Sequence, residues 1–342
     1  MFLLNKKKYI PLVQNWIIIL ILLVMSMIVI GGLTRLTDSG LSITEWELFN
    51  GLLPPLNDRE WDIYFSKYQK IPQYLILNQS MTMGEFKIIF FWEYIHRLLG
   101  RLTGIIFLLP LIFFIYKKAL SKILSFRLIV IFLLVVSQGI LGWYMVRSGL
   151  VNNITVSHYR LASHLLMAFI ILSSLFWLLL NLHYKLDKVF FNIRSSFLSL
   201  KFFILLIFIQ IIFGAFVSGL DAGRIYQTWP LMNESFFPDD IDIKIISDLF
   251  IFSSHSLIQF FHRNIAYAIF IIYLFVGYEI FKARVVRLYR SYVIVFIFIF
   301  LQILLGIYTL LSGLNILIAL SHQISSIFLI LFSLNLYHQS IE

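Results

Sequence analysis

The chain has 342 residues, is 60% hydrophobic, carries a net charge of +10 and contains no cysteine. Soluble domains are roughly 45–50% apolar, so the higher apolar fraction of this chain excludes a soluble domain. The lack of cysteine excludes disulfides, thiolate metal sites and thiol nucleophiles. Any bound metal must therefore use His, Met, carboxylate or carbonyl ligands. The positive charge is better explained by loops on one side of a membrane than by a nucleic-acid partner.

Long apolar stretches follow one another along the whole chain. We predict eight membrane-spanning helices and thus an all-α integral membrane protein, because each stretch has about the 20 residues that a helix needs to cross a bilayer. The expected spans are 13–32, 87–116, 126–147, 157–182, 198–220, 253–281, 291–312 and 314–337. The first span follows a basic N-terminus and is expected to be a retained helix rather than a cleaved signal peptide.

Basic residues are unevenly divided between the two sides of these spans. If the N-terminus is inside, 15 of the 27 Lys and Arg residues lie on the cytoplasmic side and eight lie outside, mostly in two long loops. Short cytoplasmic loops are enriched in positive charge. We therefore predict that both termini are cytoplasmic.

The two halves of the chain resemble each other. After the first and fifth spans stand GGLTRLTDSGLSITEW and GAFVSGLDAGRIYQTWP; the third and seventh spans contain SQGILGWYMVRSGL and LQILLGIYTLLSGL. Four spans separate equivalent helices, and an even number restores their direction. We predict two tandem four-helix bundles, 1–190 and 191–342, related by an internal parallel repeat. Such bundles commonly hold cofactors between facing helices.

Four histidines lie inside the even-numbered spans. Each stands roughly 7–10 residues after its span begins, which places all of them roughly 10–15 Å below the outer boundary at about 1.5 Å per residue. They are His96, His164, His262 and His322. Level imidazoles on opposed helices suit axial ligation of a haem iron. A packing or proton-path role is the alternative for any one of them, but two matched pairs favour ligation.

The remaining four histidines give weaker signals. His158 and His255 stand near outer ends of spans, where we expect interfacial side chains, although His255 is also placed to approach a haem propionate. His183 and His338 stand near cytoplasmic ends and are expected to be solvated.

The two halves differ three residues before their first paired histidine. Glu93 precedes His96, whereas Gln259 precedes His262. Residues i and i+3 share a helix face, so Glu93 is expected to point toward whatever His96 binds. A buried carboxylate is costly and is a functional-site candidate; the alternative is simple pairing with Arg97. Because Gln does not exchange a proton, we interpret the first half as built for chemistry and the second for holding a redox cofactor.

Four arginines accompany these histidines within the spans or at their ends. They are Arg97, Arg101, Arg160 and Arg263. Guanidinium groups suit the anionic propionates of haem. Structural capping or pairing with loops is an equally good explanation for each.

Several of these motifs together resemble the haem A synthase family over nearly the whole chain. They are EYIHRLLGR, SQGILGWYMVRSGL, YRLASHL, QFFHRNIAY and SHQ, preceded by GGLTRLTDSGLS. Without cysteine, the chain is similar to the proteobacterial and mitochondrial branch and not to the branch with cysteine pairs in its outer loops. The resemblance implies oxidation of the C8 methyl of haem O to a formyl group, which gives haem A for aa3-type cytochrome oxidase.

The resemblance also implies particular roles and partners. His96 and His164 would bind the substrate haem O, and Glu93 would be catalytic. His262 and His322 would hold haem B as the cofactor. The implied setting is the bacterial inner membrane, with haem O synthase, cytochrome oxidase assembly and an unidentified electron-transfer partner; a homo-oligomer is left open.

Two other functions fit part of the pattern. A bis-histidine di-haem electron-transfer protein explains four level histidines, but it does not explain why only one half has a carboxylate beside them. A transporter with parallel repeats would need broken spans near the midplane, and no Gly or Pro interruption of that kind stands at matched positions.

Overall fold

The computed structural model describes residues 4–45, 50–150, 154–190, 197–241, 250 and 252–341. Among these residues, eight helices are long and apolar enough to cross a membrane, which confirms the all-α membrane fold. They are α1 (Ile10–Leu36), α4 (Met83–Tyr116), α5 (Lys122–Gly149), α6 (His158–Tyr184), α7 (Leu198–Gly219), α8 (His255–Lys282), α9 (Tyr289–Leu311) and α10 (Ile316–Ser340).

Local capping decides where several of these helices begin. α4 starts earlier than the predicted span because Thr82 and Glu85 form a capping box, in which each side chain binds the other's backbone N–H. α10 starts after Asn315, whose side chain accepts hydrogen bonds from two backbone N–H groups of the first turn. The apolar pattern therefore located the helices, and polar side chains at their ends set the boundaries.

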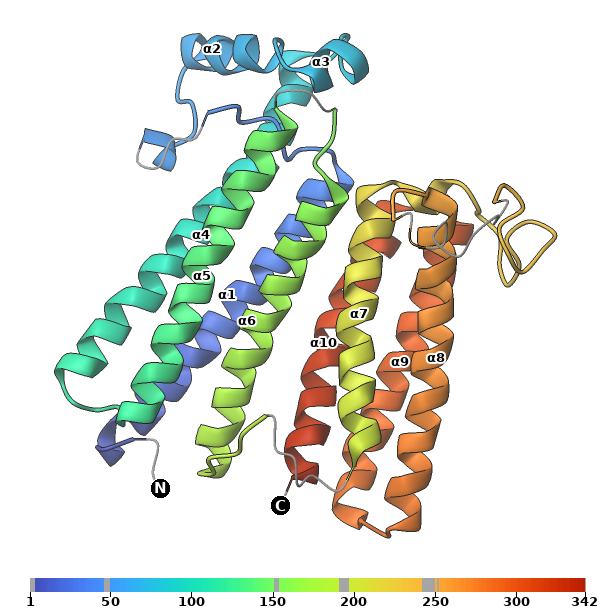
Figure 1. Ribbon diagram of the computed structural model, residues 1–342. Helices are drawn as coiled ribbons and strands as arrows, with labels where there is room; N and C mark the ends of the chain where they lie inside the picture. Colours follow the sequence, from blue (N-terminus) through green and yellow to red (C-terminus); the bar gives the residue numbers. More distant parts are fainter. Residues whose placement is uncertain are drawn as a thin grey trace.

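Two short helices, α2 (Asp58–Tyr68) and α3 (Pro72–Leu77), lie in the long segment between α1 and α4. Figure 1 shows them across the end of α4 and α5, outside the bundle. The span prediction did not include them, because neither is long enough to cross a bilayer. A cluster of aromatic and aliphatic side chains, including Trp61 and Tyr68 of α2, packs them onto Phe86 and Phe90 of α4.

The helices form two groups of four with the same order of neighbours. In the first bundle, α1, α4, α5 and α6 contact one another in a ring, and in the second bundle α7, α8, α9 and α10 do the same (Figure 1). At equivalent points after α1 and α7, Asp38 and Asp221 both adopt a left-handed backbone conformation, with φ of 50° and 52°, which Asp tolerates better than most residues. The internal repeat stays a prediction, and these two correspondences support it.

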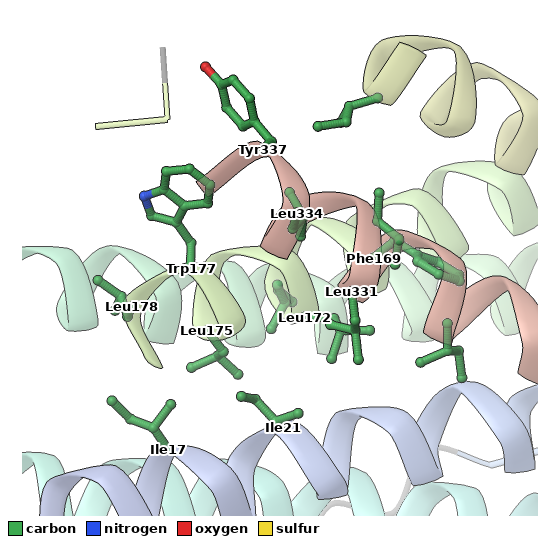
Figure 2. Packing of buried hydrophobic residues seen from close by; sticks show 14 of the residues in the cluster. Ile17, Ile21, Phe169, Leu172, Leu175, Trp177, Leu178, Leu331, Leu334 and Tyr337 are labelled. Atoms are coloured by element: carbon green, nitrogen blue, oxygen red, sulfur yellow. The ribbon is translucent and has the colours of Figure 1, made fainter. Parts of the chain in front are cut away.

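The bundles pack against each other through α1 and α6 on one side and α7 and α10 on the other. Figure 2 shows Ile17 and Ile21 of α1, Leu172 and Leu175 of α6 and Leu331 of α10 meeting in this core. One continuous hydrophobic cluster extends through both bundles. The predicted boundary between residues 190 and 191 adjoins 191–196, which lie outside the described residues, so the division into two units stays a prediction.

Figure 1 places both chain ends at the same end of the molecule, beside the α4–α5 and α8–α9 connections. The longer segments, including α2 and α3, lie at the opposite end. An even number of spans requires this arrangement of termini. The end that carries the longer segments is called the outer end below, and its membrane side stays a prediction.

Candidate functional site

The two histidines predicted to pair in the first bundle lie close together. His96 belongs to α4 and His164 to α6, two helices on opposite corners of the bundle. Their ring centroids are 6.4 Å apart and the ring planes are inclined by 62°. Imidazole–metal bonds are about 2.0–2.1 Å long, so this separation admits one metal atom between the rings.

The second bundle repeats the arrangement with His262 on α8 and His322 on α10. These two rings are close enough to interact electrostatically. Among the described residues, no group of three or more His, Asp or Glu side chains gathers as a metal site. Pairs of histidines without further protein ligands suit a porphyrin iron, which takes only its axial ligands from the protein.

Each paired histidine packs against a glycine of a neighbouring helix. A Cβ added to any of these glycines would lie 3.0–3.2 Å from the imidazole. The four contacts are Gly31 with His96, Gly142 with His164, Gly214 with His262 and Gly306 with His322. The missing side chains therefore make room for the rings. Sequence reasoning did not single out these glycines, although they stand at matched positions of the two repeated segments.

Buried ring nitrogens also support a ligand at these positions. Nδ1 of His164, His262 and His322 is buried and has no hydrogen-bond partner among the described residues. Buried polar groups normally find partners, so these three rings are incompletely satisfied by the protein alone. The residues present thus fit a haem group bound between the histidines of each pair.

Glu93 is 3% exposed and its carboxylate accepts four hydrogen bonds. Oε2 accepts from Ser42 Oγ at 2.7 Å and from the Ile43 backbone N–H at 2.8 Å. Oε1 accepts from Arg97 Nη2 at 2.6 Å and Nε at 3.1 Å. The pairing with Arg97 that the sequence left open is therefore present. The carboxylate ties α4 to the segment that follows α1, one helical turn before His96.

Gln259 occupies the equivalent position in the second bundle, but it donates a hydrogen bond where Glu93 accepts. It is 2% exposed, and its Nε2 donates to the Tyr226 carbonyl at 2.9 Å. Arg263 Nη2 donates to the same carbonyl at 3.0 Å, and Nη1 donates to the Leu231 carbonyl at 3.2 Å. Both bundles therefore fasten an outer segment to the helix that carries the first paired histidine.

The other arginines also bind outer segments or neighbouring side chains. Arg97 donates to the carbonyls of Ile43 and Glu45 at 2.8 and 3.1 Å. Arg101 donates to the Gly51 carbonyl at 2.9 Å. Arg160 donates to the Tyr144 hydroxyl at 3.1 Å. The contacts of Arg97 and Arg101 are the loop pairing that the sequence offered as the alternative to propionate binding, whereas Arg160 binds a side chain of α5.

The four remaining histidines lie away from the two pairs. His158 is partly buried and packs on Phe216 and Gly219 at the contact between the bundles, while His183 and His255 are exposed. The prediction that His338 is solvated is wrong: it is 1% exposed, and its Nε2 lies 3.0 Å from Asn181 Oδ1. The end of α10 packs against α6, which covers this ring.

An apolar groove of about 340 Å³ opens between α8 and α9 of the second bundle. Its lining is aromatic and aliphatic: Tyr267, Phe270, Ile271, Phe300 and Ile303. It therefore offers surface to apolar groups and none to charged ones. Tyr267 stands five residues after His262 along α8, and Ile303 stands three residues before Gly306 along α9.

Fold and site together define the class: a polytopic α-helical membrane protein with two pairs of histidines suited to porphyrin iron. The family described as COX15-CtaA, cytochrome oxidase assembly protein, matches residues 14–334. The chain belongs to this family, the haem A synthase family.

Individual relatives match over almost their full length. The Heme A synthase of Pelagibacter ubique is 47% identical over 326 residues, which cover 94% of this chain and 95% of that protein. The Heme A synthase of Maricaulis maris is 41% identical, with 93% and 92% covered. That of Wolbachia pipientis is 42% identical, with 95% and 96% covered.

Proposed function

We propose that this protein is a haem A synthase, an oxidoreductase that oxidises the C8 methyl of haem O to a formyl group. The observation that carries the proposal is the similarity to curated haem A synthases along nearly the whole chain. The matched residues 14–334 include Glu93 and all four paired histidines. The product, haem A, would serve aa3-type cytochrome oxidase, in keeping with a family of oxidase assembly proteins.

The two histidine pairs receive different ligands in this proposal. His96 and His164 bind the iron of the substrate haem O, and His262 and His322 bind the iron of a haem B cofactor. The 6.4 Å separation of the first pair and the glycine that receives each ring support haem binding, and the division between substrate and cofactor follows the resemblance to the family. When bound, haem supplies one-electron redox chemistry through its iron.

Glu93 is the proposed catalytic residue. Its role is to manage a proton, or to stabilise positive charge that develops at the methyl carbon. Its burial, and its place one helical turn from His96, support the proposal. The same carboxylate also fastens the segment around Ser42 and Ile43, so its chemical and structural contributions need separate tests.

The remaining assignments concern the setting of the enzyme. We place residues 1–190 around the substrate and 191–342 around the cofactor, in the bacterial inner membrane with both termini cytoplasmic. Haem O synthase would supply the substrate, and an electron-transfer partner would exchange electrons with the haem B. The shared end of the two termini and the excess of Lys and Arg on that side support the orientation.

The test is to identify the haems that copurify with the full-length protein in detergent, by extraction and chromatography. Haem B together with haem O or haem A is the expected result, because one pair would hold cofactor and the other substrate or product. Haem B alone in both bundles would instead indicate a bis-histidine electron-transfer protein and would overturn the proposal.

A further inference from the structure

Glutamine precedes the histidine-contacting glycine by four residues in three of the four helices that carry one. The pairs are Gln138 and Gly142 on α5, Gln210 and Gly214 on α7, and Gln302 and Gly306 on α9. Residues i and i+4 share a helix face, so each glutamine faces the same neighbouring helix as its glycine. In α1 the corresponding positions are Met27 and Gly31.

The three glutamines contact the histidines that pack on their glycines. Gln210 Nε2 donates to the His262 carbonyl at 2.9 Å and lies 3.4 Å from that ring's Nε2. Gln138 Nε2 donates to the His164 carbonyl at 2.9 Å. Each of these two histidines is therefore held by an amide on its backbone and by a glycine against its ring.

The third glutamine, Gln302, is itself fixed by a neighbour. Its Nε2 lies 3.3 Å from His322 Nε2, and its Oε1 accepts a hydrogen bond from Ser325 Oγ. Ser325 stands one turn after His322 on the same helix, so glutamine, serine and histidine form one polar group. Both histidines of the second bundle thus have a glutamine partner near the ring.

Met27 has a different environment in the first bundle. Its Cε lies 3.6 Å from the position that a Cβ on Gly100 would take, one helical turn after His96. Ala266 stands at the equivalent position of α8. The bundle that has the methionine therefore has the smaller residue, Gly100, at this position. A thioether offers no hydrogen-bond donor and has three rotatable bonds. Among the described residues, His96 therefore has its glycine contact but no amide from α1.

We propose that Gln210 and Gln302 are positioning residues that lock both histidines of the second bundle, while Met27 leaves His96 as the releasable ligand of the first. This inference rests on the proposed function, in which one site keeps its haem and the other must exchange substrate for product. Groups behind a metal-binding imidazole fix its orientation, and their loss typically costs 10–100-fold in metal affinity. Because a glutamine amide is present at three of the four equivalent positions and Met27 occupies the fourth, the second histidine pair is held more firmly than the first.

The test places methionine at position 210 and glutamine at position 27, in separate variants of the full-length, haem-loaded protein. Loss of haem to excess apomyoglobin is followed by visible absorption, and low-spin signals are recorded by electron paramagnetic resonance. Wild type is expected to lose haem in two phases. Gln210→Met should accelerate the slow phase about 10–100-fold and shift its low-spin signal. Met27→Gln should slow the fast phase, whereas Met27→Leu, an apolar control of similar size, should not.

The inference would be overturned if Gln210→Met lost haem in the same two phases as wild type. It would also be overturned if Met27→Gln and Met27→Leu lost haem at equal rates. If Gln210→Met does not fold, the comparison of the two Met27 variants still tests the inference. The chemical identity of the haem in each phase is determined separately by chromatography. Haem B in both phases would therefore contradict the proposed function. The rates of haem loss in the variants would still test the positioning role of Gln210.

Discussion

Glu93 and Gln259 stand at equivalent positions, yet they bind their outer segments with opposite hydrogen-bonding sense. Glu93 accepts from a hydroxyl, a backbone N–H and a guanidinium, whereas Gln259 donates to a carbonyl. An amide thus fastens a segment that presents a carbonyl, whereas the segment after α1 presents donors that need an acceptor. This difference makes the charge on Glu93 the feature to test.

Replacing that charge tests the proposed chemistry, and removing one donor to the carboxylate tests the anchoring. Glu93→Gln is expected to retain haem B but to lower haem A formation by about 10²–10⁴-fold, the usual contribution of general acid–base catalysis. The measurement is chromatographic quantification of haem A per protein. Ser42→Ala, the control, removes one donor to the carboxylate and should leave most haem A formation intact. Normal haem A output from Glu93→Gln would remove Glu93 from the catalytic role.

The glycines beside the imidazoles give a second prediction at the residue scale. Gly142→Ala would bring a Cβ to 3.0 Å from His164 Cε1, and overpacking of this kind costs roughly 1–3 kcal/mol. We expect less haem in the first bundle and a lower melting temperature. Gly139→Ala, in the same helix, meets nothing within 4 Å and should be neutral or slightly stabilising. Equal haem content in the two variants would contradict the steric role.

At the scale of elements, the segment between α7 and α8 is fastened on both sides of Tyr226. Its carbonyl accepts from Gln259 and Arg263, while its hydroxyl shares one hydrogen between the carboxylates of Asp239 and, at 2.7 Å, Asp240. Ser256 Oγ of α8 donates to Asp240 at 2.5 Å. The outer segment is therefore held to α8 by backbone and side-chain bonds together, close to the second histidine pair.

Part of this attachment should depend on pH. The hydrogen bond from Tyr226 lowers the pKa of Asp239 below its ordinary 3.8. A carboxyl with a lowered folded-state pKa contributes stability above its unfolded value and loses it as the pH falls through the folded value. The protection factors of residues 221–241, which are corrected for the pH dependence of intrinsic amide exchange, should thus fall below about pH 4 relative to neutral pH. Tyr226→Phe should show faster exchange already at neutral pH; an identical pH response in that variant would disprove the link.

At the scale of the whole molecule, α1 and α10 bring the two histidine sites near each other. Gln323, the residue after His322, packs its amide on Gly32 and donates to the Ile28 carbonyl at 2.8 Å. Gly31, beside Gly32, contacts His96. The contact between bundles therefore runs directly past one histidine of each pair.

Coupling across this contact can be measured by a double-mutant cycle. Gly32→Ala would displace the Gln323 amide, and Gln323→Ala would remove it, so each is expected to cost about 0.5–1.5 kcal/mol for the lost hydrogen bond. The double variant should cost less than the sum, because both changes remove the same interaction. Reversible unfolding in detergent measures the three free energies; strict additivity would show that the two residues do not interact.

The sequence alone determined the membrane spans and the family, and it predicted which histidines pair. Continuous apolar stretches and a repeated motif are local signals, and bilayer thickness converts them directly into helices. The helix ends were less well predicted, since capping side chains such as Thr82 and Asn315 decide them. The two short outer helices were missed, because they are too short to give a membrane-span signal, and their place is set by packing on α4.

The tertiary structure alone decided which groups surround the histidines. Three features depend on contacts between segments that are distant in the chain. They are the binding of Glu93 to Ser42 and Ile43, the glycine beside each imidazole, and the burial of His338. A periodic pattern tells which face of a helix is apolar, but it does not tell which neighbour that face meets. Close packing makes that choice, because a ring that lies 3.0–3.2 Å from a would-be Cβ fits only where the facing residue has none.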